Sequence, residues 1–431
     1  MNQPMPRWIQ HKISDLIGGE LLEIGDGFRA KNSEMAQTGL PFARAGNINN
    51  GFDFEDADLL GEKSVAQVGN KISRPDDSVI TTKGTFGRVA YVRPGTPRFV
   101  YSPQLCYWRV KNSSVIQPRF VYYWLQGPNF LSQAFQIKSS TDMADYASLT
   151  DQRRMLITAP NVETQKQIAA ILSAYDELIE NNQRRIALLE KMAEEIYREW
   201  FVRLRFPGHE KAKFVKGVPA DWEFSTINRF VEFQSGYSFK SEKYVSNGQF
   251  CIVTIKNVHD GFFVPKCSDF IDKIPSNIKK HCFLQAGDML MSLTGNVGRV
   301  CQVYGENLLL NQRVTKLKPK LPSSGHYVYW FFRQRGVHAL AELISTGAAQ
   351  QNLSPIKLGN QKVFIPNAAL LEMFEEKVRP LSEVATMSRV VCQKLEQSRD
   401  MLLPRLISGK LSVENLDIQF PPGMEEPAHE T

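Results

Sequence analysis

The chain has 431 residues, of which 42% are hydrophobic and 23% are charged, and this composition is typical of a globular protein. No stretch approaches the roughly 20 apolar residues that a membrane-spanning helix needs, so the composition argues against a membrane protein of the helical type. Residues 1–12 lack the apolar core of a signal peptide, and we therefore expect a cytoplasmic protein with no membrane partner.

The formal charge of +7 is unevenly distributed along the chain. Residues 1–160 hold 18 basic and 15 acidic residues, for a net charge of +3, and residues 207–366 hold 20 and 11, for +9. Two blocks with excess positive charge suggest an extended polyanion such as DNA as the partner. For the net charge of +3 on residues 1–160, the alternative is that the charge serves only solubility.

The six cysteines are typical of reduced, half-buried thiols in a cytoplasmic protein, because no two of them form a C-x-x-C pair. Four of the six fall between Cys251 and Cys301, so a zinc site remains an alternative. We expect no metal bound by this chain.

The first block, residues 1–160, mixes short β-rich runs such as SVITT and RVAYV with Gly and Pro, and a helix is expected to begin near Pro118. Residues 81–89 read TTKGTFGRV. A glycine-rich run that ends in a basic residue is compatible with a phosphate-binding loop and equally with a tight turn between strands.

A long helix is predicted for residues 161–206, since no Gly or Pro occurs between Thr164 and Arg203. Apolar positions alternate at spacings of four and three, which is the heptad pattern of a coiled-coil seam. Asn182 is the one clearly polar member of the seam. The alternative to a coiled coil is a helix that packs on its own lobe, where the lobes are residues 1–160 and 207–366. The seam consists of Ile168, Leu172, Tyr175, Ile179, Asn182, Ile186, Leu189, Ala193, Ile196 and Trp200.

Residues 207–366 repeat the first block, and residues 292–300 read SLTGNVGRV at an offset of 211 from the earlier run. Asn47 corresponds to Asn257 at offset 210, and the FVYYW run at 120–124 corresponds to YVYWF at 327–331, where a second helix is expected near His326. The conserved order of these matches indicates two copies of a unit of about 200 residues.

A second long helix is predicted for residues 367–410, with Pro380 expected to kink it and Pro404 to end it one turn early. Two matched seams in one chain favour mutual antiparallel pairing, and about 40 helical residues would extend for about 60 Å. The second seam consists of Phe374, Val378, Leu381, Ala385, Ser388, Cys392, Leu395, Arg399, Leu402 and Leu406.

The last segment, residues 411–431, holds five acidic residues and no Lys or Arg, and its Pro- and Glu-rich composition predicts disorder.

Signatures of catalysis are missing from the sequence. It contains no G-x-x-x-x-G-K-[ST] phosphate-binding loop, no H-E-x-x-H metal motif and no Asn-Pro-Pro-aromatic motif of amino-methyltransferases. We therefore predict a protein that binds DNA without a catalytic residue of its own.

This layout resembles the specificity (S) subunit of type I restriction-modification systems over almost the whole chain. The residues that carry the resemblance are the run at 160–201, the run QKLEQSRDMLLPRLISGKL at 393–411, the paired glycine motifs and STGAAQQNLS at 345–354. In the first lobe the counterpart of the last run reads STDMADYASLTD, which departs from it and predicts a different target.

The resemblance implies an α+β fold, in which two β-rich α/β target recognition domains are separated by two long helices packed as an antiparallel coiled coil, with an internal pseudo-twofold repeat. The domains would be residues 1–160 and 207–366, the helices residues 161–206 and 367–410. Each recognition domain would read half of a split double-stranded DNA target. The helices would dock two modification subunits, which methylate adenine with S-adenosylmethionine, and restriction (motor-nuclease) subunits would join with ATP and magnesium.

We predict DNA contacts from side chains of suitable chemistry, because Arg, Asn and Gln can read base edges, while Lys and Arg hold phosphates. Arg88 and Arg299 are identical in both copies, which favours a phosphate or framework role for them. The candidates in the first lobe are Arg44, Asn47, Lys83, Thr85, Arg88, Asp142 and Tyr146, and those in the second lobe are Lys256, Asn257, Asn296, Arg299, Arg313, Gln350 and Gln351.

Two alternatives remain on the sequence alone. One is an orphan DNA-binding protein without methyltransferase partners, and the other is a coiled-coil adaptor with no nucleic-acid role. Strong salt dependence of DNA binding would argue against the adaptor.

Overall fold

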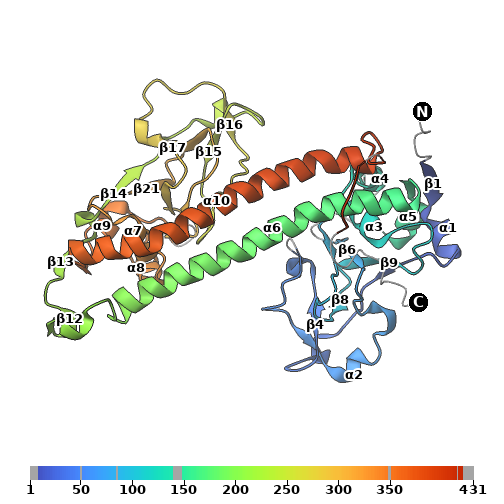
Figure 1. Cartoon of the computed structure of the whole chain (residues 1–431), viewed down its shortest axis with the longest axis horizontal. Coiled ribbons are helices and arrows are strands. Elements are labelled where there is room, and N and C mark those ends of the chain that lie inside the picture. Colours follow the sequence, from blue (N-terminus) through green and yellow to red (C-terminus); the bar gives the residue numbers. More distant parts are fainter. Residues whose placement is uncertain are drawn as a thin grey trace. The chain divides into compact units, whose positions relative to one another are not determined.

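The computed structural model describes residues 8–48, 51–83, 86–138, 148–347, 351–414 and 416–420 (Figure 1). The chain forms two compact units, of which the first comprises residues 1–178 with 395–431 and the second comprises residues 179–394. Among the described residues, no helix is both long and apolar enough to cross a membrane.

The first unit is built around a four-stranded antiparallel sheet of order β2-β9-β6-β7, beside a four-stranded sheet of order β3-β5-β4-β8 and the pair β1-β10. Its strands are β1 (Ile9–Lys12), β2 (Leu22–Asp26), β3 (Met35–Ala36), β4 (Leu40–Ala43), β5 (Leu59–Leu60), β6 (Ser78–Thr81), β7 (Val89–Tyr91), β8 (Val100–Tyr101), β9 (Leu105–Val110) and β10 (Leu156–Ala159). Its shorter helices are α1 (Ile13–Gly18), α2 (Glu62–Val65), α3 (Pro118–Trp124), α4 (Pro128–Lys138) and α5 (Leu149–Arg154).

The second unit repeats the first sheet as β14-β21-β18-β19 and the strand pair as β13-β22. Its other sheet has the order β16-β15-β20-β17, in which β16, β15 and β20 correspond to β5, β4 and β8, and the remaining edge strand differs. Its strands are β11 (Phe214–Val215), β12 (Val218–Pro219), β13 (Glu223–Thr226), β14 (Val231–Ser235), β15 (Phe250–Val253), β16 (Phe270–Ile271), β17 (Phe283–Leu284), β18 (Met289–Ser292), β19 (Val300–Gln302), β20 (Leu308–Leu310), β21 (Val314–Pro319) and β22 (Lys362–Ile365). Its shorter helices are α7 (Gly325–Phe332), α8 (Arg335–Ile344) and α9 (Pro355–Gly359).

Local sequence explains where several of these helices begin. Pro118 occupies the first turn of α3, where its missing N–H costs nothing. Ser148 and Ser354 stand at matched positions before α5 and α9, and their hydroxyls accept from the backbone N–H groups of Asp151 and Lys357. The helices expected near Pro118 and His326 are present, but each unit contains further helices that the sequence patterns did not indicate.

The two long helices are α6 (Val162–Tyr197), extended by a π-helical turn η4 (Arg198–Val202), and α10 (Ala368–Ile407). They pair antiparallel in both units, as predicted. In the first unit Arg399 Nη1 lies 2.7 Å from Asp176 Oδ1, and in the second the Arg389 guanidinium pairs with the Glu190 carboxylate. Every residue of the two seams is buried or half-buried.

Both helices also complete the cores of the units, so the alternative of packing on a lobe applies as well. Ile168 and Leu172 of α6 and Leu406 of α10 belong to the core of the first unit. Tyr197 of α6 and Phe374 of α10 belong to the core of the second. The compact units therefore divide each helix, whereas the domain boundaries expected from sequence set the helices apart.

The end of α10 corrects one expectation. The helix continues through Pro380 and passes Pro404 to end at Ile407. Pro404 deprives the last turn of one hydrogen bond, and the burial of Leu403, Leu406 and Ile407 in the first core compensates for that loss.

The acidic tail is only partly described. Val413 is 1% exposed, and Leu411 and Ile418 pack against the core of the first unit, so this part of the tail is ordered, contrary to expectation. Residues 415 and 421–431 lie outside the described residues.

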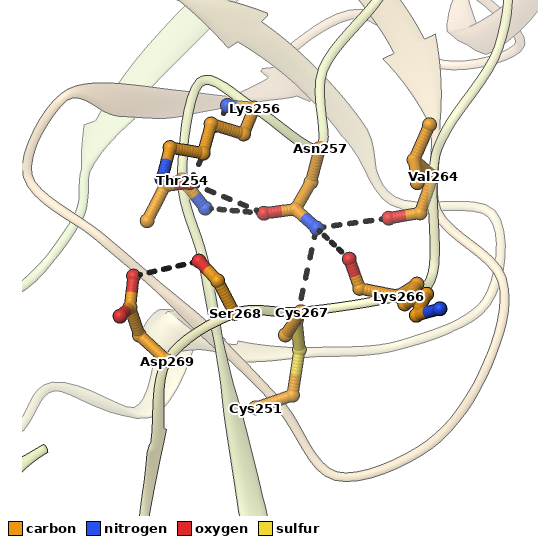
Figure 2. The surroundings of a disulfide bond; sticks show 9 residues. All are labelled: Cys251, Thr254, Lys256, Asn257, Val264, Lys266, Cys267, Ser268 and Asp269. Atoms are coloured by element: carbon orange, nitrogen blue, oxygen red, sulfur yellow. Dashed lines mark hydrogen bonds between the residues drawn. A yellow bond between two sulfur atoms is a disulfide. The ribbon is translucent and has the colours of Figure 1, made fainter. Parts of the chain in front are cut away.

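Two of the cysteines form a disulfide, which also departs from expectation. Cys251 on β15 bonds to Cys267, which precedes β16, and their Cα atoms are 5.8 Å apart (Figure 2). The pairing of β15 with β16 brings the two thiols together. Cys106, Cys282, Cys301 and Cys392 are buried thiols. Among the described residues, no three His, Cys, Asp or Glu side chains are grouped as metal ligands.

Candidate nucleic-acid interface

The repeated glycine motif forms the same turn in both units, and it connects two antiparallel strands. The β6–β7 turn is closed by the bond from the Gly87 N–H to the Thr81 carbonyl at 3.1 Å, and the β18–β19 turn by the bond from the Gly298 N–H to the Ser292 carbonyl at 2.9 Å. Gly87 and Gly298 have φ values of +93° and +78°, which glycine adopts without strain. The motif is therefore a strand-to-strand turn.

A hydroxyl at the end of the first strand fixes the arginine that follows this turn. Thr81 Oγ1 accepts from the Arg88 backbone N–H at 3.0 Å, and Ser292 Oγ accepts from the Arg299 backbone N–H at 3.1 Å. The backbone of both arginines is thus held identically, so the two units differ here only through their side chains.

In the first unit the Arg88 side chain has a framework role. Its Nη1 donates to the carbonyl of Ile48 at 3.3 Å and lies 3.5 Å from that of Ala45. These bonds join the hairpin turn to the loop that contains Arg44 and Asn47. Lys83 is exposed in the same turn.

Asn47 makes two hydrogen bonds that hold the backbone around it, and its role as a base reader stays a prediction. Asn47 Oδ1 accepts from the Arg44 N–H at 2.8 Å, and its Nδ2 donates to the Asp53 carbonyl at 2.9 Å. Arg44 itself is half-buried, pairs with Asp58 and lies over the Phe42 ring. Both amide groups of Asn47 are therefore engaged within the protein.

Asn257 makes the corresponding bonds in the second unit (Figure 2). It is 3% exposed, its Oδ1 accepts from the Thr254 N–H at 2.9 Å, and its Nδ2 donates to the Val264 carbonyl at 2.9 Å. A buried amide with both groups satisfied stabilises its loop, and the role of Asn257 as a base reader stays a prediction. Its neighbour Lys256 is exposed.

Three of the candidates in the second unit lie together beside the hairpin turn. Asn296, Arg299 and Gln351 line one open pocket of about 480 Å³. The Gly295 N–H donates to the Gln351 carbonyl at 3.0 Å, so Gln351 lies against the turn. With its amide oxygen facing Arg299, Asn296 accepts from Arg299 Nη2 at 2.7 Å. Arg313 is exposed at the start of β21, outside this group.

Four candidates, Thr85, Asp142, Tyr146 and Gln350, lie outside the described residues.

Sequence reasoning missed three residues of this pocket, which are Arg333, Arg335 and His338 at the start of α8. Arg333 lies over the rings of Trp330 and Tyr329, with its Cζ 4.7 and 5.3 Å from their centroids. The only sequence signal for these residues was the charge of +9 on residues 207–366.

Asp260 connects two of these residues. Its Oδ1 lies 3.4 Å from His338 Nε2 and 3.8 Å from Arg333 Nε. Burial raises the pKa of Asp260, but the nearby imidazole of His338 and the charge of Arg333 outweigh this, so the pKa lies below the usual value for Asp. Asp260 is therefore ionised at neutral pH.

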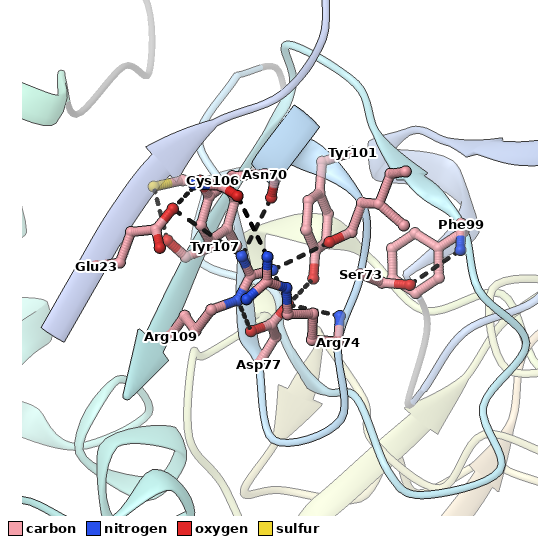
Figure 3. A network of polar contacts seen from close by, with 11 residues as sticks. Glu23, Asn70, Ser73, Arg74, Asp77, Phe99, Tyr101, Cys106, Tyr107 and Arg109 are labelled. Carbon is pink, nitrogen blue, oxygen red and sulfur yellow. Dashed lines mark hydrogen bonds and ion pairs between the residues drawn. The ribbon is translucent and has the colours of Figure 1, made fainter. Parts of the chain in front are cut away.

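A buried ion pair supports the β6 strand of the first unit (Figure 3). Asp77 precedes β6 and accepts from Arg109 Nε and Nη2, both at 2.7 Å, and from the Tyr101 hydroxyl at 2.7 Å. Burial and the Asp77 carboxylate raise the pKa of Tyr101, so its hydroxyl stays protonated and donates. In the second unit the matched carboxylate, Asp288, pairs with Lys316 at 2.7 Å.

Comparison with known proteins gives matches to both units. A model of the family described as "Type I restriction modification DNA specificity domain" matches residues 18–191 and again residues 219–369. The type I restriction enzyme HindI specificity subunit of Haemophilus influenzae is 20% identical over 450 residues, which cover 85% of this chain and 97% of that protein.

The type I restriction enzyme MjaIX specificity subunit of Methanocaldococcus jannaschii is 27% identical over 277 residues. The match covers 60% of this chain and about three fifths (61%) of that relative's length. The crystal structure of the type I S subunit from M. genitalium shares the fold, with a TM-score of 0.56 and 16% identity, and the match covers 94% of this chain and 97% of that one.

Proposed function

Because the chain belongs to the type I restriction-modification DNA specificity family, we propose that it is a non-catalytic subunit that selects the DNA target for partner subunits. Each lobe reads one half of a bipartite double-stranded site. The observation that carries this proposal is the repeat of one framework with two different surfaces. The turns around Arg88 and Arg299 share their backbone bonds, whereas the side chain of Arg88 bonds within the protein and that of Arg299 lines an open pocket.

The long helices supply the surfaces for partner subunits in this proposal. Leu188 and Met192 of α6 are 63% and 53% exposed, and Met387 and Met401 of α10 are 72% and 65% exposed. Leu188 and Met192 lie one turn apart on one face of α6, and neighbouring exposed apolar side chains of this kind are typical of surfaces that other proteins cover. Two modification subunits would bind there and methylate adenine with S-adenosylmethionine, and restriction subunits would join with ATP and magnesium.

The helix pair would also set the distance between the half-sites. At 1.5 Å per residue, the 36 residues of α6 extend for about 54 Å and the 40 residues of α10 for about 60 Å. Such lengths exceed one turn of B-DNA, which is about 34 Å. A protein with this role is expected in the cytoplasm, where it has access to DNA.

The proposal is tested with the purified chain in complex with its modification subunits. We expect methyl transfer to a duplex that contains the split target and at least 100-fold less to a duplex of random sequence, since specific binding exceeds non-specific binding by about 10³ or more. Equal methylation of the two duplexes would refute the proposal.

Two alternative functions predict different results when the purified chain is tested for DNA binding. An orphan DNA-binding protein would bind the split site with no modification subunit present. A coiled-coil adaptor would bind DNA weakly, and its binding would not fall steeply as salt rises.

A further inference from the structure

The pocket beside the second hairpin turn holds an excess of positive charge. Arg299, Arg333 and Arg335 line it together with two carboxylates, Asp260 and Glu342. The carboxylate of Asp260 is already compensated, because both Arg333 and His338 lie within 4 Å of it. The charge of Asp260 therefore does not offset the remaining arginines.

Arg335 is the cation of this pocket that is available to a ligand. Its side chain is exposed, and among the residues that the structure describes it makes no hydrogen bond or ion pair. Glu342 lies seven residues further along α8, which is about 10 Å along the helix axis, so it does not neutralise Arg335. Arg299 is held by Asn296 through its guanidinium and provides a second, pre-positioned donor group.

The described residues of the first lobe contain no counterpart of this arrangement. The matched helices begin at Pro128 in α4 and at Arg335 in α8, an offset of 207, which is the offset of the preceding aromatic runs. At that offset Gln126 stands in place of Arg333, and Leu131, which packs against the first core, stands in place of His338. Among the residues that the structure describes, the positive pocket thus belongs to the second lobe.

We propose that this pocket binds a phosphodiester group of the DNA backbone, with the Arg335 guanidinium as the main contact and Arg299 as the second. The assignment deepens the proposed function and rests on it for the identity of the ligand. Guanidinium groups suit this ligand because their fork of N–H donors matches two phosphate oxygens. The first lobe then makes one phosphate contact fewer, and the two half-sites contribute unequally to the salt dependence of binding.

The experiment measures binding of the complex with its modification subunits to a duplex at several salt concentrations. We expect Arg335→Ala to weaken binding about 5- to 10-fold and to reduce the slope of log K against log[salt] by about 0.9, the value for one phosphate contact. Arg335→Lys keeps the charge, so we expect its slope to stay near that of the wild type. Arg229→Ala is the control, since it removes one exposed charge of the same unit that pairs with Glu223.

A scan with neutral methylphosphonate linkages locates the contact. In the wild type we expect one linkage in one half-site to weaken binding, and in Arg335→Ala that linkage should have no further effect. An unchanged salt slope, or an equal methylphosphonate penalty in Arg335→Ala and wild type, would overturn the inference. So would a loss confined to the target duplex, because that result assigns Arg335 to a base.

The outcome is separable from that of the proposed function. A phosphate contact contributes to binding of any duplex, so the slope is measured on a random duplex as well. If the wild type fails to prefer the split target while Arg335→Ala still lowers the slope, the proposed function fails and the phosphate contact stands. If the wild type prefers the target and Arg335→Ala equals Arg229→Ala, only the phosphate contact fails.

Discussion

Replacement of Asp77 by Asn tests whether the buried network of the first lobe stabilises it as the geometry indicates (Figure 3). The Asp77 side chain is 0% exposed and that of Arg109 is 6% exposed. The change removes the negative charge that pairs with the Arg109 guanidinium. It also turns an amide N–H toward the N–H donors of Arg109. Breaking a buried ion pair typically costs about 3–5 kcal/mol. Arg109 keeps the carbonyls of Asn70 and Ile72 as acceptors, so we expect about 3 kcal/mol, the lower end.

The matched position in the second unit provides a control. Asp288 and Lys316 are 16% and 18% exposed, so water can solvate both groups when the pair is broken. We expect Asp288→Asn to cost about 1–2 kcal/mol. The double variant Asp77→Leu with Arg109→Met should recover most of the loss, because well-packed apolar groups often replace a buried ion pair at little cost.

The assay must distinguish the two units, because a chain with two compact units need not unfold in one transition. Amide hydrogen exchange, measured peptide by peptide, gives the free energy of opening of β6 with β9 and of β18 with β21 separately. Equal losses for Asp77→Asn and Asp288→Asn, or a loss below about 1 kcal/mol for Asp77→Asn, would refute the reasoning from burial.

Three further predictions follow from the same structure. Gly298→Ala should destabilise the second unit by about 1 kcal/mol more than Gly87→Ala destabilises the first, as measured by hydrogen exchange. The reason is that a Cβ at Gly298 would lie 3.2 Å from the Ala341 Cβ, whereas a Cβ at Gly87 would meet open space. Equal losses in the two units would contradict this prediction. Glu190→Ala should cost about 2 kcal/mol in the second unit, since Arg389, 10% exposed, loses its partner, and a loss only in the first unit would refute it. Deleting one heptad from each long helix removes about 10 Å and should shorten the gap between methylated half-sites by about three base pairs, and an unchanged gap would show that the helices do not set it.

The architecture could be predicted from sequence because its signals are local and repeated. The spacing of Ile168, Leu172 and Ile179 determines which face of α6 is buried without knowledge of its partner. The glycines of the two hairpin turns mark positions of positive φ in both copies, and their shared offset reveals the duplication. The prediction that Pro404 ends α10 early was wrong, because the effect of this proline depends on tertiary packing, which holds the last turn of α10 in the first core.

The candidate site was predicted less completely, because residue type does not specify where a side chain lies. Asn47 and Asn257 have the chemistry of base readers, yet the same amide satisfies a loop, and only the fold shows that both groups are engaged. Arg335 and His338 belong to no motif, and they reach the pocket because α8 packs beside the hairpin turn. The Cys251–Cys267 bond likewise depends on strand pairing across 16 residues.

The central claim is that each lobe reads its own half of the target, and an exchange of one lobe tests it most directly. Residues 207–366 are replaced by the second lobe of a related subunit, and methylated adenines are mapped across the genome of cells that contain the modification subunits. We predict a split motif in which one half stays the same and the other half changes. A motif that changes in both halves, or in neither, would contradict the claim.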